Sequence, residues 1–143
     1  MNEILKDINL YSDNDIINMI RANNMLCLHV KNPSEKVQKA MIEITPRNIL
    51  RIENPSDDIK KLAIVKDPYI IQDIKEQTDE LQLLAVKTDY RAISCIDNPC
   101  ELVKEYIFKN APTEIVNMKL VSDDDKYRAI ITSLAYIMKH IKY

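Results

Sequence analysis

The feature that most constrains the fold of this chain is a short motif that recurs at multiples of 22 residues. Asn-Pro-Ser, Asn-Pro-Ser and Asn-Pro-Cys begin at Asn32, Asn54 and Asn98, and an acidic residue follows each of them. Recurrence at one fixed period of this length is typical of proteins that stack copies of a small structural unit. The period of 22 residues therefore predicts a repeat protein.

A period of 22 starting at Asn2 divides the chain without any insertion, and it gives every residue a position from 1 to 22. Position 4 is Leu, Cys or Ile in every full repeat, and position 7 is Ile, Val or Met. Position 11 is Ser, Thr or Cys, and position 19 is Ile, Val or Phe. The repeats are 2–23, 24–45, 46–67, 68–89, 90–111 and 112–133, followed by a C-terminal segment at 134–143.

The first part of each repeat has the pattern of a short helix. Positions 4 and 7 are three residues apart and share one helical face over about positions 1–8. Proline occupies position 1 in three repeats, where its missing N–H costs nothing, and Thr45, Asp67 and Asp89 precede position 1 as candidate N-caps. The Asn-Pro pair is expected to end this helix, because a residue before proline avoids the α region and Asn tolerates a left-handed helix end.

The second part of each repeat has the pattern of a longer helix. The Ser or Thr at position 11 is a helix N-cap, and the acids that follow complement the helix dipole. Apolar side chains at positions 14, 18 and 19 form the stripe expected to be buried. The end repeats should deviate, since position 14 is Asp15 in the first repeat and Asp125 in the sixth.

Two short helices cannot bury their apolar faces alone, so neighbouring repeats must stack into a shared core. The sequence thus predicts an all-α fold. We expect a right-handed α-solenoid of six two-helix repeats with a closing helix at 134–143, forming a single domain over residues 1–143.

Composition excludes several classes of functional site. The chain contains no glycine, so phosphate-binding loops, dinucleotide fingerprints and nucleophile elbows in their usual forms are excluded. The three cysteines do not suggest a disulfide framework. Since neither a signal peptide nor a membrane-spanning run is apparent, we expect a cytoplasmic protein without membrane contact.

The motif Asn-Pro-Ser-Asp/Glu, followed by Ala-Val/Ile and Asp-Pro-x-x-Ile, resembles short helical repeats of the leucine-rich-variant type. It is also similar to uncharacterised repeats in bacterial, phage and giant-virus proteins. The resemblance covers residues 24–111 well and the ends loosely. It implies an interaction scaffold, and by analogy a phage or mobile-element protein that acts on a host complex. It transfers no functional residue.

Metal, cofactor and catalytic sites find little support in the sequence. His29 and His140 are the two histidines, and Cys27 lacks a second ligand pair at zinc spacing. No metal, cofactor or catalytic residue is predicted, and the chain is expected not to be an enzyme. The alternative is a thiol enzyme acting through Cys100, because a thiol at a helix N-terminus can have a lowered pKa.

The candidate binding residues are those that the repeat does not dictate. Positions 2 and 6 of the first helix lie four apart and, in an α-helix, form a ridge away from the buried face. Arg and Tyr, which are enriched at binding hot spots, gather there in the middle repeats. The predicted site residues are Met25, His29, Arg47, Arg51, Tyr69 and Arg91.

These observations predict an interaction module whose partner is a protein. The alternative is a solenoid that binds RNA or single-stranded DNA, although the net charge of −2 and the acidic helix starts work against it. Self-association is a further prediction. The C-terminal segment contains Tyr136, Ile137, Met138 and Ile141, which would offer apolar surface to a second copy in a homodimer.

Overall fold

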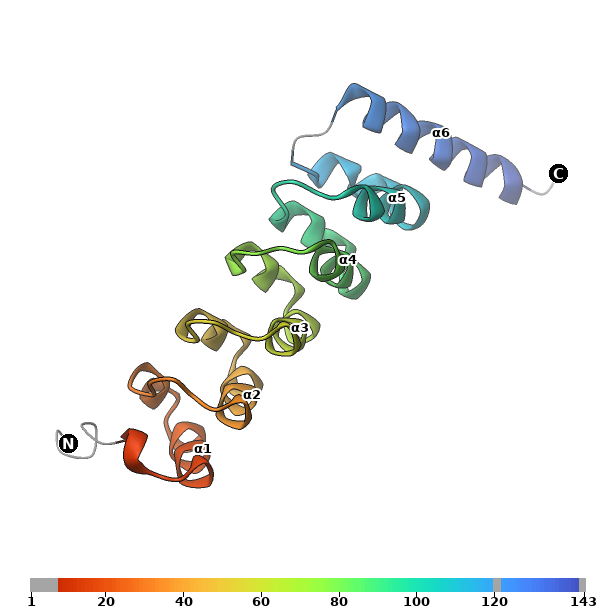
Figure 1. Cartoon of the computed structure of the whole chain (residues 1–143). Coiled ribbons are helices and arrows are strands. Elements are labelled where there is room, and N and C mark those ends of the chain that lie inside the picture. The colour runs from red at the N-terminus through yellow and green to blue at the C-terminus, as the bar shows by residue number, and fades with distance from the viewer. Residues whose placement is uncertain (1–7, 120–121, 142–143) are drawn as a thin grey trace. The chain divides into compact units, whose positions relative to one another are not determined.

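The computed structural model describes residues 8–119 and 122–141, and every regular element in those ranges is a helix (Figure 1). The predicted all-α class and the 22-residue repeat are therefore confirmed. The chain forms two compact units, residues 1–70 and 71–143. The predictions of a single domain and of a right-handed superhelix stay predictions.

Each repeat pairs a short 3-10 helix with an α-helix of ten residues, except at the C-terminus. The first unit contains η2 (Ile8–Leu10), α1 (Asp13–Ala22), η3 (Asn24–Leu28), α2 (Glu35–Ile44), η4 (Pro46–Arg51) and α3 (Asp57–Lys66). The boundary between the units falls within η5 (Pro68–Asp73). The second unit contains α4 (Asp79–Thr88), η6 (Tyr90–Cys95), α5 (Glu101–Asn110), η7 (Pro112–Asn117) and α6 (Asp123–His140).

The first helix of each repeat is a 3-10 helix, which explains the spacing of its buried residues. Side chains three apart eclipse each other in this helix, so positions 4 and 7 point the same way. All described residues at these positions are buried, from Ile8 to Met118. Helices η3 to η7 end at position 5 or 6, before the position of the Asn-Pro pair, whereas η2 of the first repeat covers positions 7–9. At position 7, Ile52 and Ile96 are extended, so the Asn-Pro pair lies in the connection and does not end the helix.

One extended residue at position 22 both ends an α-helix and begins the next 3-10 helix. This residue is extended at Asn23, Thr45, Asp67 and Asp89, with φ between −147° and −156°. Ala111 has a similar φ of −145°, but its ψ of 59° lies outside the extended region. Three of these side chains accept a hydrogen bond from the N–H two residues later, at 2.9–3.1 Å. The predicted caps Asp67 and Asp89 are thus confirmed, whereas Thr45 makes no side-chain cap. Within the described chain only Asn32 has positive φ, so left-handed asparagine is not the general helix end.

The residue at position 11 caps the second helix, as predicted. Ser12, Ser34, Ser56, Thr78 and Ser122 each accept from the backbone N–H three residues later, over 3.1–3.4 Å. Cys100 stands at the equivalent position without such a hydrogen bond. Position 14 is buried in the four middle repeats, as are the neighbouring residues at positions 18 and 19. The core of each unit therefore lies between its 3-10 helices and its α-helices.

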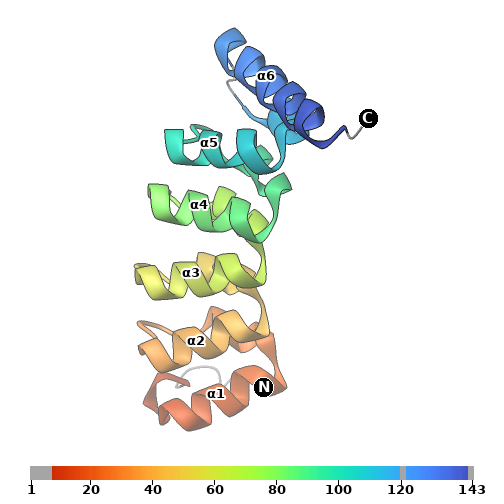
Figure 2. The same cartoon turned by 90° about the vertical axis from the view of Figure 1, so that its right-hand side faces the viewer.

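Within the first unit, α1, α2 and α3 lie side by side (Figure 2), and polar pairs at equivalent positions join the repeats. The Lys36 ammonium donates to Asn14 Oδ1 at 2.6 Å, and the Lys31 N–H donates to Asn9 Oδ1 at 2.7 Å. Each pair is separated by one period of 22 residues. These contacts hold neighbouring repeats in register, because a shift of one residue would separate every such pair.

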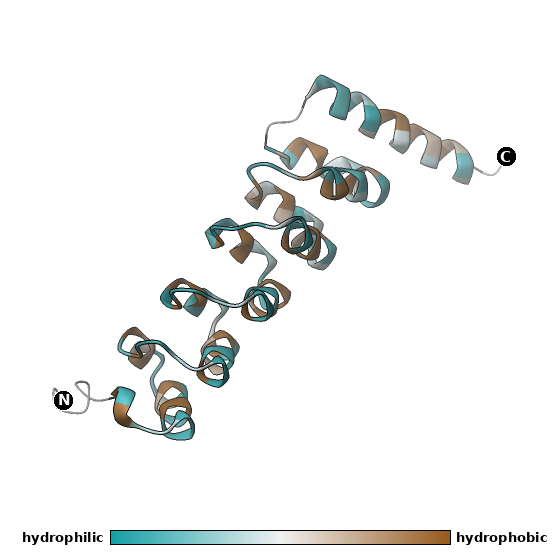
Figure 3. Ribbon diagram, viewed as in Figure 1, coloured by the Kyte–Doolittle hydropathy of each residue, from teal (hydrophilic) through white to brown (hydrophobic). Residues whose placement is uncertain are grey.

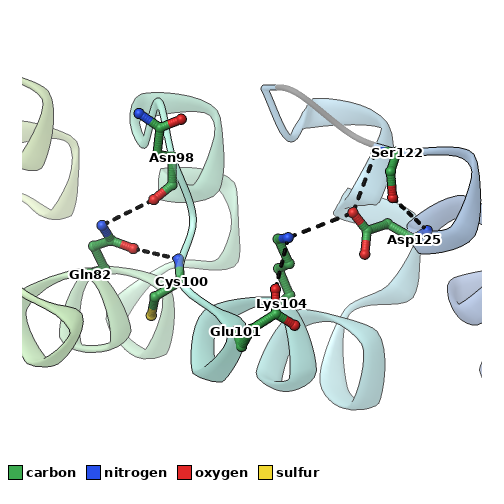
Figure 4. Close-up of polar contacts among 7 residues, drawn as sticks. All are labelled: Gln82, Asn98, Cys100, Glu101, Lys104, Ser122 and Asp125. Carbon is green, nitrogen blue, oxygen red and sulfur yellow. Dashed lines mark hydrogen bonds and ion pairs between the residues drawn. The ribbon is translucent and has the colours of Figure 1, made fainter.

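In the second unit, the side chain at position 15 makes the corresponding connection (Figure 4). Gln82 on α4 donates to the Asn98 carbonyl at 3.3 Å and accepts from the Cys100 N–H at 2.9 Å. One repeat later, Lys104 lies 3.0 Å from the Glu101 carboxylate and 3.7 Å from that of Asp125. The deviating Asp125 is therefore buried and paired, and it completes a capping box with Ser122.

The predicted C-terminal closing helix exists as a continuation of α6, which has 18 residues. The second helix of the sixth repeat does not stop at position 22, which is Ser133. Leu134 and Ala135 follow, and both are strong helix formers without the proline that begins several other repeats. Helix α6 contacts α5 and η7 near its start and is tilted relative to α5 (Figure 2).

Replacement of Cys100 by Ser should stabilise the protein, because a hydroxyl would supply the cap that the thiol lacks. The equivalent Ser34 also donates to the Asp13 carboxylate at 2.6 Å, and Asp79 lies beside Cys100 in the same way. We expect the free energy of unfolding to rise by about 1 kcal/mol, the usual value of an N-cap. Urea denaturation followed by circular dichroism measures it. Cys95→Ser, outside any cap, is the control, and an equal or lower stability of Cys100→Ser would contradict the prediction.

Candidate partner-binding surface

The six predicted site residues lie on consecutive 3-10 helices, and all have exposed side chains. Met25 and His29 lie on η3 and at its end, Arg47 and Arg51 on η4, and Tyr69 on η5, all in the first unit. Arg91 lies on η6 in the second unit. A binding role for these residues stays a prediction.

The 3-10 geometry changes which of these side chains share a face. Four residues advance a 3-10 helix by about 120° beyond a full turn, so positions 2 and 6 diverge. Positions 2 and 5 are eclipsed instead. An α-helical period groups Arg47 with Arg51 on one face and leaves out Leu28 and Leu50. The three-residue spacing of the apolar positions 4 and 7 was the signal that could have indicated a 3-10 helix, and with it the grouping of positions 2 and 5.

Met25, Leu28, Arg47 and Leu50 together form a surface that we call the η3–η4 face. Helices η3 and η4 are in contact, and these residues occupy positions 2 and 5 of each. The three apolar side chains are 61%, 54% and 58% exposed at Met25, Leu28 and Leu50. Arg47 makes no hydrogen bond or ion pair with the described part of the chain. The η3–η4 face is thus an apolar surface with one guanidinium group that is available to a partner.

Arg51 instead supports a buried polar cluster within the first unit. Its guanidinium donates to Asn48 Oδ1, and Asn48 is fully buried. The Asn48 amide donates in turn to the Met41 carbonyl at 2.8 Å and to Asn24 Oδ1 at 2.9 Å. The cluster therefore joins the second and third repeats, and Arg51 has a structural role that its exposure does not reveal.

Cys27 belongs to the same cluster and resembles a core residue. It is buried at the position 4 column, and its thiol lies 3.4 Å from Asn24 Oδ1. Burial raises the pKa of Cys27, and the Arg51 charge opposes this effect only in part. Among the described residues, no group of three His, Cys, Asp or Glu side chains could hold a metal ion.

Cys100 does not show the lowered pKa that a reactive thiol at a helix N-terminus would have. Burial raises its pKa above the ordinary value, and the nearby Asp79 carboxylate raises it further, although the N–H groups of Val103 and Leu102 oppose both effects. The thiolate needed for nucleophilic chemistry is therefore disfavoured at neutral pH. The raised pKa thus does not favour the thiol-enzyme alternative, which stays a prediction.

A recess of about 540 Å³ lies in the first unit between the connections that follow η3 and η4. Its lining includes Lys31, Asn32, Gln38, Arg51 and Glu53. Gln38 is the counterpart of Gln82, and its Nε2 donates to the Pro33 carbonyl at 2.9 Å. Its Oε1 is buried without a hydrogen bond, whereas that of Gln82 binds the next repeat. The connection between the second and third repeats is thus weaker at this point.

A second recess, in the second unit, lies between the starts of α5 and α6 and contains several charged groups. Glu101, Lys104, Asp124, Asp125 and Arg128 contribute to its wall. Hydrogen bonds from Ser122 hold the pKa of Asp125 below its usual value, and the nearby Lys104 charge adds to this effect. The hydrogen bond to the Glu101 carboxylate raises the pKa of Lys104. Both groups therefore stay charged at neutral pH. This favours a structural ion pair over general acid–base catalysis, which needs a pKa near the working pH.

Comparison of the chain with protein families, with curated proteins and with solved structures finds no match. No helix in the described ranges combines the length and the apolar character needed to span a bilayer.

Replacement of Asn48 by Ala should destabilise the first unit. The substitution leaves Asn24 Oδ1, the Met41 carbonyl and the Arg51 guanidinium without their shared partner. We expect the free energy of unfolding to fall by about 1–3 kcal/mol, as for other buried hydrogen-bonding groups. Chemical denaturation checks this against Asn18→Ala, which removes an exposed amide on α1. Equal stability of the two variants would show that the cluster contributes nothing.

Acid should destabilise the protein partly through Asp125. Its pKa is lower in the folded state than the ordinary value of 3.8, so the unfolded chain takes up this proton first. The stabilisation is complete above about pH 5 and is lost as the pH falls through 3.8 toward the folded pKa. The free energy of unfolding should therefore fall more steeply between about pH 5 and pH 3 in the wild type than in Asp125→Asn. Parallel curves would exclude this role.

Proposed function

We propose that the chain is a non-enzymatic interaction module that binds a protein partner through the η3–η4 face. The observation that supports this proposal is the exposure of Met25, Leu28 and Leu50 around Arg47. The similarity of the repeat to short helical repeats in phage and giant-virus proteins suggests a partner in a host complex.

The composition of this face suits a protein partner. Interface centres are enriched in Met and Arg, and a few such residues provide most of the binding energy. None of the four residues is needed for the core, since positions 4 and 7 carry the buried side chains of these helices. Their exposed apolar surface is unfavourable in water and becomes favourable once a partner covers it.

The η3–η4 face favours a protein over a nucleic acid for an electrostatic reason. A nucleic-acid site needs several cations along the phosphate backbone. This face has Arg47 as its one charged residue, and the α-helices of the same unit begin with acids such as Glu35, Asp57 and Asp58.

The double variant Arg47→Glu/Leu50→Ser tests the proposal. Immobilised wild-type chain should retain a protein from an extract of its native host, with or without nuclease. The purified partner is then titrated against each variant. Loss of two central residues should weaken binding about 30-fold or more, since a hot spot contributes about 2 kcal/mol or more. The melting temperature should change little, because both side chains are exposed.

Lys109→Glu/Val116→Ser is the matched control, since it makes the same chemical changes at exposed residues of α5 and η7. Arg51 is left intact, because its contact with Asn48 would confuse stability with binding. Unchanged affinity in Arg47→Glu/Leu50→Ser would remove the η3–η4 face from consideration. The nucleic-acid alternative would be supported if nuclease abolished the retention of the bound protein on the immobilised chain, and if added salt weakened that retention steeply.

A further inference from the structure

Helix α6 contains hydrophobic residues along most of its length (Figure 3), and its large apolar side chains are exposed to solvent. Residues that recur at three- and four-residue intervals lie on one face of an α-helix. The large apolar residues of α6 and its C-cap follow this spacing, and each is more than half exposed. They are Tyr127, Ile130, Ile131, Leu134, Ile137, Met138 and Ile141, which we call the α6 face.

Over residues 125–133, the opposite side of α6 packs against the rest of the second unit, whereas residues 134–139 are exposed. Asp125 and Ala129 are its buried residues, and Thr132 and Ser133 are half-buried. Small and polar residues thus face inward, while the large apolar residues face outward. Tyr136 lies about half a turn from Leu134 and so falls outside the α6 face, although the sequence grouped it with its apolar neighbours.

The α6 face is large enough for a stable contact. A monomeric protein ordinarily exposes apolar patches of at most a few hundred Å². Seven large side chains, each more than half exposed, exceed this and approach the ~800 Å² that each partner contributes to a standard interface. The cost of leaving this face in water favours a partner that covers it.

We propose that the α6 face binds the α6 face of a second copy, in antiparallel orientation, to form a two-fold symmetric dimer. This goes beyond the proposed function, because it uses another surface in the other unit and needs no foreign protein.

Self-pairing of α6 is favoured over a head-to-tail contact because residues 8–23 of the first repeat offer no matching apolar face. Helix α1 buries Ile16, Ile17 and Ile20, and it exposes Asn14, Asn18, Arg21 and other polar residues. In the described part of the first repeat, the exposed large apolar side chains are Leu10 and Tyr11, both ahead of α1. A contact between unlike ends would therefore leave most of the α6 face opposite polar residues. A two-fold symmetric contact between two α6 faces instead places apolar side chains of one copy against apolar side chains of the other.

The charges on α6 favour the antiparallel orientation. Asp123 and Asp124 are exposed in the first turn, and Lys139 is exposed in the last turn. Lys126 pairs with Asp123 at 2.8 Å, which leaves Asp124 as the exposed acid without such a pair among the described residues of the first turn. Parallel helices would bring the acidic turns of both copies together. Antiparallel helices separate them by roughly 27 Å, the length of 18 helical residues, and turn each toward the basic end of the other helix. Leu134 is midway between Tyr127 and Ile141, so the two-fold axis should pass beside it.

Analytical ultracentrifugation of the full chain over a range of concentrations provides the first test. We expect a reversible dimer in the wild type, and Leu134→Glu should weaken dimerisation about 30-fold or more, because it places two carboxylates at the axis. The control is Val116→Glu, which puts the same charge on an 82% exposed residue of η7 and should leave the dimer intact. Circular dichroism must show equal helix content in all three proteins.

Cross-linking provides a second test that does not depend on disrupting the face. In a Cys95→Ser/Cys100→Ser background, Leu134→Cys should form a disulfide between two identical chains under mild oxidation. Tyr127→Cys and Ile141→Cys should each fail to do so alone and should cross-link when mixed. These outcomes follow because a disulfide needs Cα atoms about 5.5–6 Å apart.

Three results would overturn the proposal. The first is a monomer at every concentration, and the second is a dimer that Leu134→Glu leaves unchanged. The third is efficient cross-linking of Tyr127→Cys with itself, which would show a parallel pair. Binding of a foreign protein or of lipid vesicles to a monomeric chain, lost in Leu134→Glu, would assign the face to that ligand instead. The η3–η4 face is untouched by these variants, so failure here leaves the proposed function standing.

Discussion

The hydrogen bond that a side-chain oxygen accepts from a backbone N–H at most of the helix starts is the interaction on which this structure depends. The chain has no glycine, so it cannot reverse direction through the conformations that glycine allows at low cost. It turns twice in each repeat through an extended residue, and most of these residues accept a backbone N–H with an oxygen of their own side chain. Helix ends, helix lengths and the 22-residue period all follow from this choice.

The sequence was sufficient for the all-α class, the period and the caps at position 11, because each depends on local chemistry that recurs six times. It did not determine whether the first helix of each repeat is an α-helix or a 3-10 helix. Apolar residues three apart fit one turn of either an α-helix or a 3-10 helix, and the difference decides which side chains share a face. For this reason Leu28 and Leu50 were missed and Arg51 was grouped with Arg47.

The contacts of single, non-repeating residues were also beyond sequence analysis. Asn48 occupies a position that holds Leu26, Ile70 and Ala92 in other repeats. Apolar residues at this position indicate burial, but they do not predict that an Asn would form hydrogen bonds with Asn24, Met41 and Arg51. The same is true of α6. Its apolar residues were visible in the sequence, but the side of the helix that packs inward depends on the tertiary position of Asp125 and Ala129.

The polar pairs between equivalent positions have a consequence for how the chain folds. The hydrogen bonds between equivalent parts of adjacent repeats join residues about one period apart, such as Asn9 and Lys31 or Asn24 and Asn48. Ordering therefore needs the closure of short loops alone, which costs little entropy and favours rapid folding. Any adjacent pair of repeats can act as a nucleus, and growth then proceeds by addition of one neighbour at a time. Such a chain can acquire native structure progressively during synthesis, before its last repeat has left the ribosome.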